Sequence, residues 1–264
     1  MNDKRSVSFA SALFTVGGVF AVFLVWIAAS AIVDNAMLLP SPAATFSALT
    51  SLLTERASLL SIGATILRLV AALAGATLLG LSAGVAAGLV DGVYRFLRPV
   101  VTVLRTVPVI SIVVIVLIVF GFSSTPYVIT FLMIFPLVFQ AAADGIRRID
   151  PELVDVYRLE DDTVLGGLRY CYMPLIASDV RTALLQSAGL GVKVLVMAEY
   201  LAQTPSSIGN ALYLAKVELD FATVFAWTAL LVLMAAAIEA AVRRRAARVP
   251  RENASMSVKR SETD

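Results

Sequence analysis

Two charged residues, Lys193 and Glu199, lie in an otherwise apolar stretch and are the residues best placed to act on a solute. A lysine in the middle of a membrane helix costs about 3 kcal/mol, so Lys193 is expected to face protein or water. There it could attract an anionic solute, or it could have a structural role as an ion-paired or snorkelling side chain. Glu199 follows six residues later on a different helix face, so no direct pair with Lys193 is expected. It could line an outer gate or lie at the membrane interface.

Other kinds of chemistry find little support in the sequence. There is no histidine and only one cysteine, Cys171, so the commonest general base and metal ligands are scarce. No stretch matches the G-x-x-x-x-G-K-S/T pattern of a phosphate-binding loop. The net charge of +2 is too small to indicate nucleic-acid binding. We therefore expect no catalytic residue, no metal, no cofactor and no nucleic-acid partner, and we expect the chain not to be an enzyme.

The composition indicates a protein that lies in a lipid bilayer. Of 264 residues, 59% are hydrophobic and 15% are charged, whereas about 25% are charged in an ordinary soluble domain. A bilayer core needs about 20 apolar residues per helix, and a turn-like stretch, Gly121 to Pro126, divides the longest uncharged run. We predict an all-α polytopic membrane protein with six transmembrane helices in one domain, residues 1–248. The predicted spans are 9–33, 61–90, 100–120, 126–143, 178–200 and 221–242, and residues 249–264 are expected to form a disordered cytoplasmic tail.

The distribution of lysine and arginine predicts the orientation. If the N-terminus is cytoplasmic, the inside segments hold fifteen of these residues and the outside loops hold two, Arg56 and Lys216. Both termini are then cytoplasmic. Arg68 lies near the outer start of the second span, where snorkelling would explain it. A cleaved signal peptide at the N-terminus is the alternative, although the uncharged stretch from Ser6 to Val33 is longer than such a segment requires.

The longest polar interval, within residues 144–177, is predicted to face the cytoplasm. Asp150 before Pro151 is typical of a helix start, and a helix over Pro151–Leu159 would place apolar side chains on one face. A second helix is expected over Thr163–Arg169, ended by Pro174. An apolar face here indicates a docking surface for a partner protein; the alternative is an ordinary solvated loop. The candidate contact residues are Leu153, Asp155, Val156, Tyr157, Arg158, Leu159, Glu160 and Asp161.

Small residues and prolines predict how the helices pack. Glycines recur at near four-residue spacing in the second span, and Gly84 and Gly88 form a G-x-x-x-G pair. Such pairs let helices approach closely in lipid; the alternative role is a hinge. Pro108 and Pro136 are expected to kink the third and fourth spans.

Several short stretches resemble segments of one known family. Together they resemble the binding-protein-dependent ABC permeases, in particular the branch that serves taurine, alkanesulfonates, nitrate and related solutes, from Leu39 to the end of the sixth span. The stretches are Leu39-Pro40-Ser41-Pro42, Thr65-Ile66-Leu67-Arg68, Leu97-Arg98-Pro99, Leu104-Arg105-Thr106-Val107-Pro108, Asp144-Gly145-Ile146-Arg147, Ala198-Glu199 and Ser207-Ile208-Gly209.

The signature of that family is only partly present. Its coupling loop reads E-A-A-x3-G-x9-I-x-L-P, and alignment on Pro174 places the Glu position at Asp155 and the Gly position at Asp161. The spacing is kept, while the name-giving residues are not. This departure leaves open which ATPase the chain would contact.

The resemblance implies a type I ABC importer permease in a bacterial plasma (inner) membrane, without ATPase activity of its own. Its partners would be an ATP-binding ABC subunit, a second permease copy, most simply as a homodimer, and an extracytoplasmic solute-binding protein. The solute would be small and organic or anionic, such as a sulfonate, nitrate or vitamin precursor. A stand-alone secondary transporter or channel is the alternative, although such proteins often carry internal repeats and the two halves of this chain show no convincing one.

Overall fold

The computed structural model describes residues 3–33, 35, 38–160, 163 and 166–247; at 3–16, 19, 156–160, 243 and 245–247 only the backbone is described. This part of the chain is helical and contains no strand, which confirms the all-α prediction. The helices are α1 (Asp3–Val33), α2 (Pro42–Thr54), α3 (Arg56–Leu89), α4 (Asp91–Thr106), α5 (Val109–Arg147), α6 (Pro151–Glu160), the π-helix η1 (Gly167–Tyr172), α8 (Met173–Ala202), α9 (Ile208–Val217) and α10 (Phe221–Ala247).

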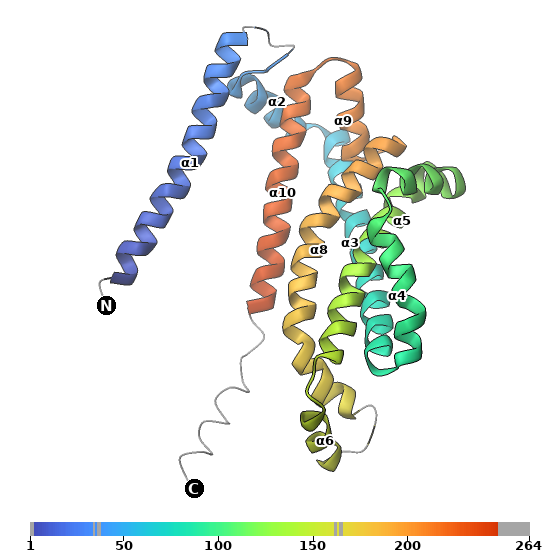
Figure 1. Cartoon of the computed structure of the whole chain (residues 1–264). Helices are drawn as coiled ribbons and strands as arrows, with labels where there is room; N and C mark the ends of the chain where they lie inside the picture. The colour runs from blue at the N-terminus through green and yellow to red at the C-terminus, as the bar shows by residue number, and fades with distance from the viewer. Residues whose placement is uncertain (1–2, 34, 36–37, 161–162, 164–165, 248–264) are drawn as a thin grey trace.

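The long helices α3, α5 and α8 pack against one another, α10 lies against α8, and α4 lies beside α3 and α5 (Figure 1). The short helices α2 and α9 lie at one end of this bundle, called here the α9 end. The short helix α6 lies at the opposite end, called here the α6 end. Helix α1 stands apart from the bundle in Figure 1 and meets it near α2, where Trp26 stacks on Phe225 of α10 and donates a hydrogen bond to the carbonyl of Pro40.

Four helical segments of the described chain are long and apolar enough to cross a bilayer: Arg56–Leu89, Val109–Arg147, Gly167–Ala202 and Phe221–Val242. They contain the predicted fourth, fifth and sixth spans, and the predicted second span apart from its last residue, Val90. The predicted first span falls in α1, Asp3–Val33, of which Phe20–Val33 is described as an apolar helix with its side chains. These observations define a polytopic membrane protein, while six crossings remain a prediction.

The predicted third span, 100–120, is not a single helix. Its first residues belong to α4, and the extended backbone of Val107 and Pro108 then separates α4 from α5. Pro108 thus ends a helix instead of kinking one, because a proline disfavours helical backbone at the residue before it. The following segment up to Phe120 has twelve residues, or about 18 Å of helix, which is too short for a hydrocarbon core of about 30 Å.

The predicted break near residues 121–126 is confirmed at Gly121. Gly121 has φ +74° and ψ 176°, a backbone conformation that glycine adopts readily and other residues do not. The Thr125 hydroxyl donates a 2.7 Å hydrogen bond to the Gly121 carbonyl at this break. The long apolar run therefore consists of two helices that meet at this residue.

Candidate functional site

A buried polar network lies at the α9 end, centred on Glu199 in the last turn of α8. The Glu199 side chain is 0% exposed and accepts hydrogen bonds from three directions. The hydroxyl of Thr65 lies 3.0 Å from both carboxylate oxygens, and the guanidinium of Arg68 lies 3.0 Å from one. The backbone N–H of Gly209 donates a longer hydrogen bond of 3.3 Å. The network joins α3, α8 and α9 around one carboxylate.

The turn between α8 and α9 is shaped so that its backbone faces this network. Gln203 and Ser206 have positive φ values, 49° and 51°, which reverse the chain after α8. Arg68 then donates to the carbonyls of Pro205 and Ser206 at 3.1 Å each. The Ser207 hydroxyl caps α9 by accepting from the N–H of Asn210 at 3.0 Å. Arg68 is therefore bonded to α8 and to the turn that follows it.

Close approach of α8 and α9 depends on Gly209. A Cβ atom at this position would lie 2.4 Å from the Cβ of Glu199 and 2.4 Å from the backbone nitrogen of Tyr200. Only glycine allows its N–H to reach the Glu199 carboxylate with this backbone. A neighbouring hydrogen bond, from the N–H of Ile208 to the Thr65 hydroxyl at 3.1 Å, fixes the same helix start to α3.

Two interpretations of charged residues change with this geometry. Arg68 does not snorkel to the membrane surface, because its side chain is 13% exposed and forms an ion pair with Glu199. Glu199 is fully enclosed, so in this structure it does not line an open path. Its partner is Arg68 and not Lys193, in agreement with the predicted difference in helix face. The stretches that contain Thr65, Arg68, Glu199 and Gly209 were each recognised by resemblance, but their meeting point was not predicted.

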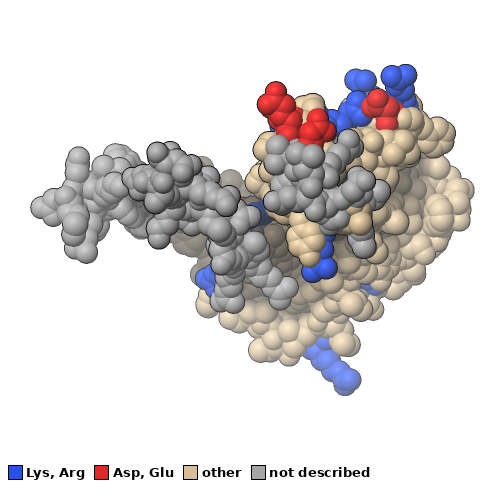
Figure 2. Space-filling model, turned by 90° about the horizontal axis from the view of Figure 1, so that it is seen from below, with Lys and Arg blue, Asp and Glu red and all other residues tan. Residues whose placement is uncertain are grey.

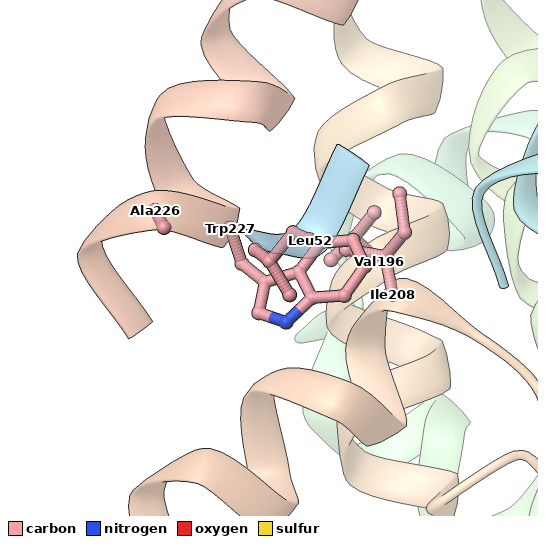
Figure 3. Packing of buried hydrophobic residues seen from close by; sticks show 5 residues of the cluster. All are labelled: Leu52, Val196, Ile208, Ala226 and Trp227. Carbon is pink, nitrogen blue, oxygen red and sulfur yellow. The ribbon is translucent and has the colours of Figure 1, made fainter. Parts of the chain in front are cut away.

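An apolar core and a cavity flank the network. Leu52 of α2, Val196 of α8 and Ile208 of α9 lie around the indole of Trp227 of α10 (Figure 3), and Ala226 belongs to the same buried cluster. Beside them is a cavity of about 330 Å³ that opens at the α9 end. Its polar lining includes Glu55, Ser58, Ser61, Ser206, Asn210, Glu218 and Asp220. The α9 end thus combines a packed apolar interior with a polar surface hollow.

Lys193 belongs to an uncovered stripe along α8. Thr182, Gln186, Lys193 and Met197 are exposed and follow one face of the helix, whereas Leu195 on another face is completely buried. Glutamine and lysine side chains in a membrane-spanning helix are costly against lipid. The stripe is therefore suited to face water or a second protein chain. Of the two predicted path residues, Lys193 is accessible and Glu199 is buried.

The opposite end contains the predicted coupling loop. The Asp150 carboxylate accepts from the N–H of Glu152 at 3.0 Å, and α6 begins at Pro151, which confirms the predicted helix start. Leu153 is 50% exposed, and Asp155 also lies on the surface. For Val156, Tyr157, Arg158, Leu159 and Glu160 only the helical backbone is described, and Asp161 lies outside the described residues. The contact of these residues with a partner protein therefore remains a prediction.

The second predicted helix of this loop does not end at Pro174. The π-helix η1 continues directly into α8, so that Gly167–Ala202 forms one continuous helix. The N–H of Met173 bonds to the carbonyl of Leu168, five residues back. At the change from π to α register, the wider turn accommodates a proline that has no N–H to donate. The prediction that Pro174 stops the helix was wrong.

Two ion pairs anchor the base of this loop. Arg147 lies 2.6 Å from Asp91 at the start of α4, and Arg148 lies 3.0 Å from Asp179 of α8. The hydrogen bond and the positive charge from Arg147 lower the pKa of Asp91 below its ordinary value, so the pair stays charged at neutral pH. Figure 2, which shows this end, places acidic and basic side chains close together at one edge of a largely uncharged face.

A second hollow lies beside α6. It has a volume of about 250 Å³. Its lining includes Leu89, Ile146, Ile149, Val154, Asp155 and Tyr172. Helix α6 is therefore not packed flat against the bundle along this side, and part of the bundle surface beneath it is open.

These features define the chain as a multi-pass helical membrane protein with a polar stripe on one spanning helix and a short helix at one end. The family model described as "Binding-protein-dependent transport system inner membrane component" matches residues 76–249, about two thirds of the chain. The chain belongs to this family and is a membrane permease component of binding-protein-dependent ABC transport. Membership implies association with an ATPase and a binding protein. A comparison with curated proteins finds no match.

Proposed function

We propose that the chain forms the translocation path for a small organic or anionic solute and couples it to a separate ATPase through α6. The observation that carries this proposal is the polar stripe on α8, because it brings an accessible lysine into a helix otherwise suited to lipid and protein. The positive charge favours an anion, in keeping with the resemblance to permeases for sulfonates and nitrate.

The proposed arrangement has six membrane crossings, with α6 and both termini in the cytoplasm. The crossings beyond the four that meet length and hydropathy criteria would be made by α1 and by α4 together with the first part of α5. The excess of lysine and arginine in the segments at the α6 end supports this orientation. The α9 end would then face outward and meet the binding protein.

We further propose a complex of two copies of this chain with two ATP-binding subunits. The α8 stripe supports a second copy, since two facing stripes would enclose a path that one chain leaves open on one side. The short helix α6 and its exposed Leu153 support ATPase contact. The chain would have no enzyme activity itself, which is consistent with a sequence that lacks a phosphate-binding loop.

Gentle purification from the native membrane through a C-terminal tag tests the assembly. We expect an ATP-binding subunit in near-equal amount and two copies of the chain per complex. Leu153→Asp and Tyr157→Asp should reduce the recovered ATPase at least tenfold, because a charge would enter an apolar contact. Glu152→Ala, an exposed residue of the same helix, should leave recovery unchanged. A chain that purifies alone and moves a solute down an ion gradient in liposomes would instead be a secondary transporter.

Lys193 gives a second prediction, on solute transport. Lys193→Ala should lower the initial uptake rate of an anionic solute about tenfold, the effect of losing one charge-assisted hydrogen bond to the solute. Lys193→Arg keeps the charge and should retain most of the uptake. The measurement is uptake into proteoliposomes that contain the whole complex, with Lys216→Ala, an exposed lysine of α9, as the control. Equal uptake by the wild type and Lys193→Ala would assign the residue a structural role.

A further inference from the structure

Helix α8 connects the two ends of the molecule without a break. Together with η1 it forms a helix of 36 residues, Gly167–Ala202, which corresponds to a length of about 50 Å. One end packs near α6, and the other ends beneath α9. The polar stripe with Lys193 lies between them. A displacement of α9 can therefore reach both the stripe and α6, provided that α9 is firmly attached to α8.

The Glu199 network provides such an attachment. Its carboxylate accepts from Thr65 and Arg68 of α3 and from the N–H of Gly209 of α9. Arg68 in turn holds the carbonyls of Pro205 and Ser206, the residues between α8 and α9. All these groups lie at the junction of three helices, and Glu199 itself has no exposed surface. The bonds of Glu199 to Thr65 and Gly209 lie in a poorly solvated site and cannot be exchanged for water without loss, whereas the bonds of Arg68 to Pro205 and Ser206 lie nearer the surface.

The outer side of the same segment is available for contact. Lys216, Val217, Glu218 and Leu219, at the end of α9, are exposed, and the cavity of about 330 Å³ opens beside Asn210. A protein that binds the α9 end can therefore press on α9 while the opposite side of this helix is bonded to Glu199.

We propose that Arg68 and Glu199 are positioning residues that lock α9 to α8. Contact of the external binding protein with the α9 end then moves α8, and this movement displaces α6. This inference rests on the proposed function for its partners, but the lock itself is a property of this chain. Neither residue needs to touch the solute. Loss of either should therefore uncouple the two ends while leaving Lys193 and α6 in place.

The lock can be tested on the full chain in lipid nanodiscs by measuring distances between spin labels. One pair, at Arg56→Cys and Lys216→Cys, reports on α9 relative to α3; a reference pair, at Leu78→Cys and Leu233→Cys, reports on α3 relative to α10. All four positions are exposed, and Cys171→Ala removes the native thiol. We expect Glu199→Gln and Arg68→Gln to broaden the first distance distribution and not the second. A first distribution as narrow as that of the wild type would overturn the lock.

The consequence for transport is measured on the whole complex as ATPase activity with and without the binding protein. Glu199→Gln should reduce the stimulation by the binding protein about tenfold, within the range of ordinary coupling between sites, while basal ATPase activity stays unchanged. Thr65→Ser, which keeps the hydroxyl, should retain the stimulation, and Thr65→Val should lose it. A stimulated wild type whose Glu199→Gln variant responds equally would overturn this inference alone. A wild-type chain without any associated ATPase would overturn the proposed function as well.

Discussion

Arg68→Ala is expected to lower the free energy of unfolding by about 3–5 kcal/mol, the usual effect of removing one partner from a buried ion pair. The Glu199 carboxylate would keep Thr65 and Gly209 but lose its positively charged partner, which lies 3.0 Å away. The carbonyls of Pro205 and Ser206 would also lose their donor. Thermal unfolding in detergent, followed by size-exclusion chromatography, measures the effect.

Two further variants distinguish the stability lost with the ion pair from the stability lost with any surface cation. Arg56→Ala removes an exposed arginine at the start of the same helix, and we expect a change within about 0.5 kcal/mol. The double variant Arg68→Met/Glu199→Leu removes both charges and should be more stable than Arg68→Ala, since no buried charge is left without its partner. If Arg68→Ala unfolds at the temperature of Arg56→Ala, the ion pair contributes nothing to stability.

The sequence contained the residues of this network, but it did not show that they lie together in the fold. Thr65 and Arg68 are three residues apart on α3, so helical geometry alone places them on one face. Glu199 lies 131 residues after Arg68, and no local pattern states which helix faces meet in three dimensions. Snorkelling offered a sufficient explanation for an arginine near the end of a span, so nothing in the sequence required a partner for it.

Local signals were reliable where the structure depends on neighbouring residues. Asp150 and Pro151 predicted the start of α6, because a cap is formed by a side chain and the backbone two residues later. Gly121 predicted the break in α5, because a positive φ depends on the residue itself and glycine adopts it readily. Pro174 failed as a stop signal, since a π turn just before it accommodates its ring and its missing N–H. That turn has no pattern in the sequence from which it could be read.

The predicted third span is not one helix for a different physical reason. An uncharged apolar run shows that a segment can lie in lipid, but not that it crosses the bilayer as one straight helix. Val107 and Pro108 interrupt the run, and the helix from Val109 to Phe120 is too short to cross by itself. Composition could therefore place this region in the membrane, but it could not show how the helix axes run relative to the bilayer.

Gly84→Ala is expected to destabilise the protein by about 1–3 kcal/mol, the usual range for overpacking a closely packed interior. A Cβ atom at Gly84 would lie 2.6 Å from the carbonyl oxygen of Phe139 and 2.8 Å from the Cβ of Ala142, both in α5. A backbone carbonyl cannot move aside without shifting the helix that carries it, so α3 and α5 would have to separate. Thermal unfolding in detergent and the yield of monodisperse protein measure the effect.

The same helix offers graded controls that distinguish packing from a hinge. Gly63 has no atom within 4 Å of the position of a Cβ, and at Gly75 the nearest atom is 3.9 Å away, so alanine fits at both. Stability should therefore be kept in Gly63→Ala and Gly75→Ala and lost in Gly84→Ala. A hinge would give the opposite signature, with transport lost in Gly84→Ala at full stability. Stability that is equal in all three variants would mean that α3 and α5 do not approach as closely as the Gly84 contacts require.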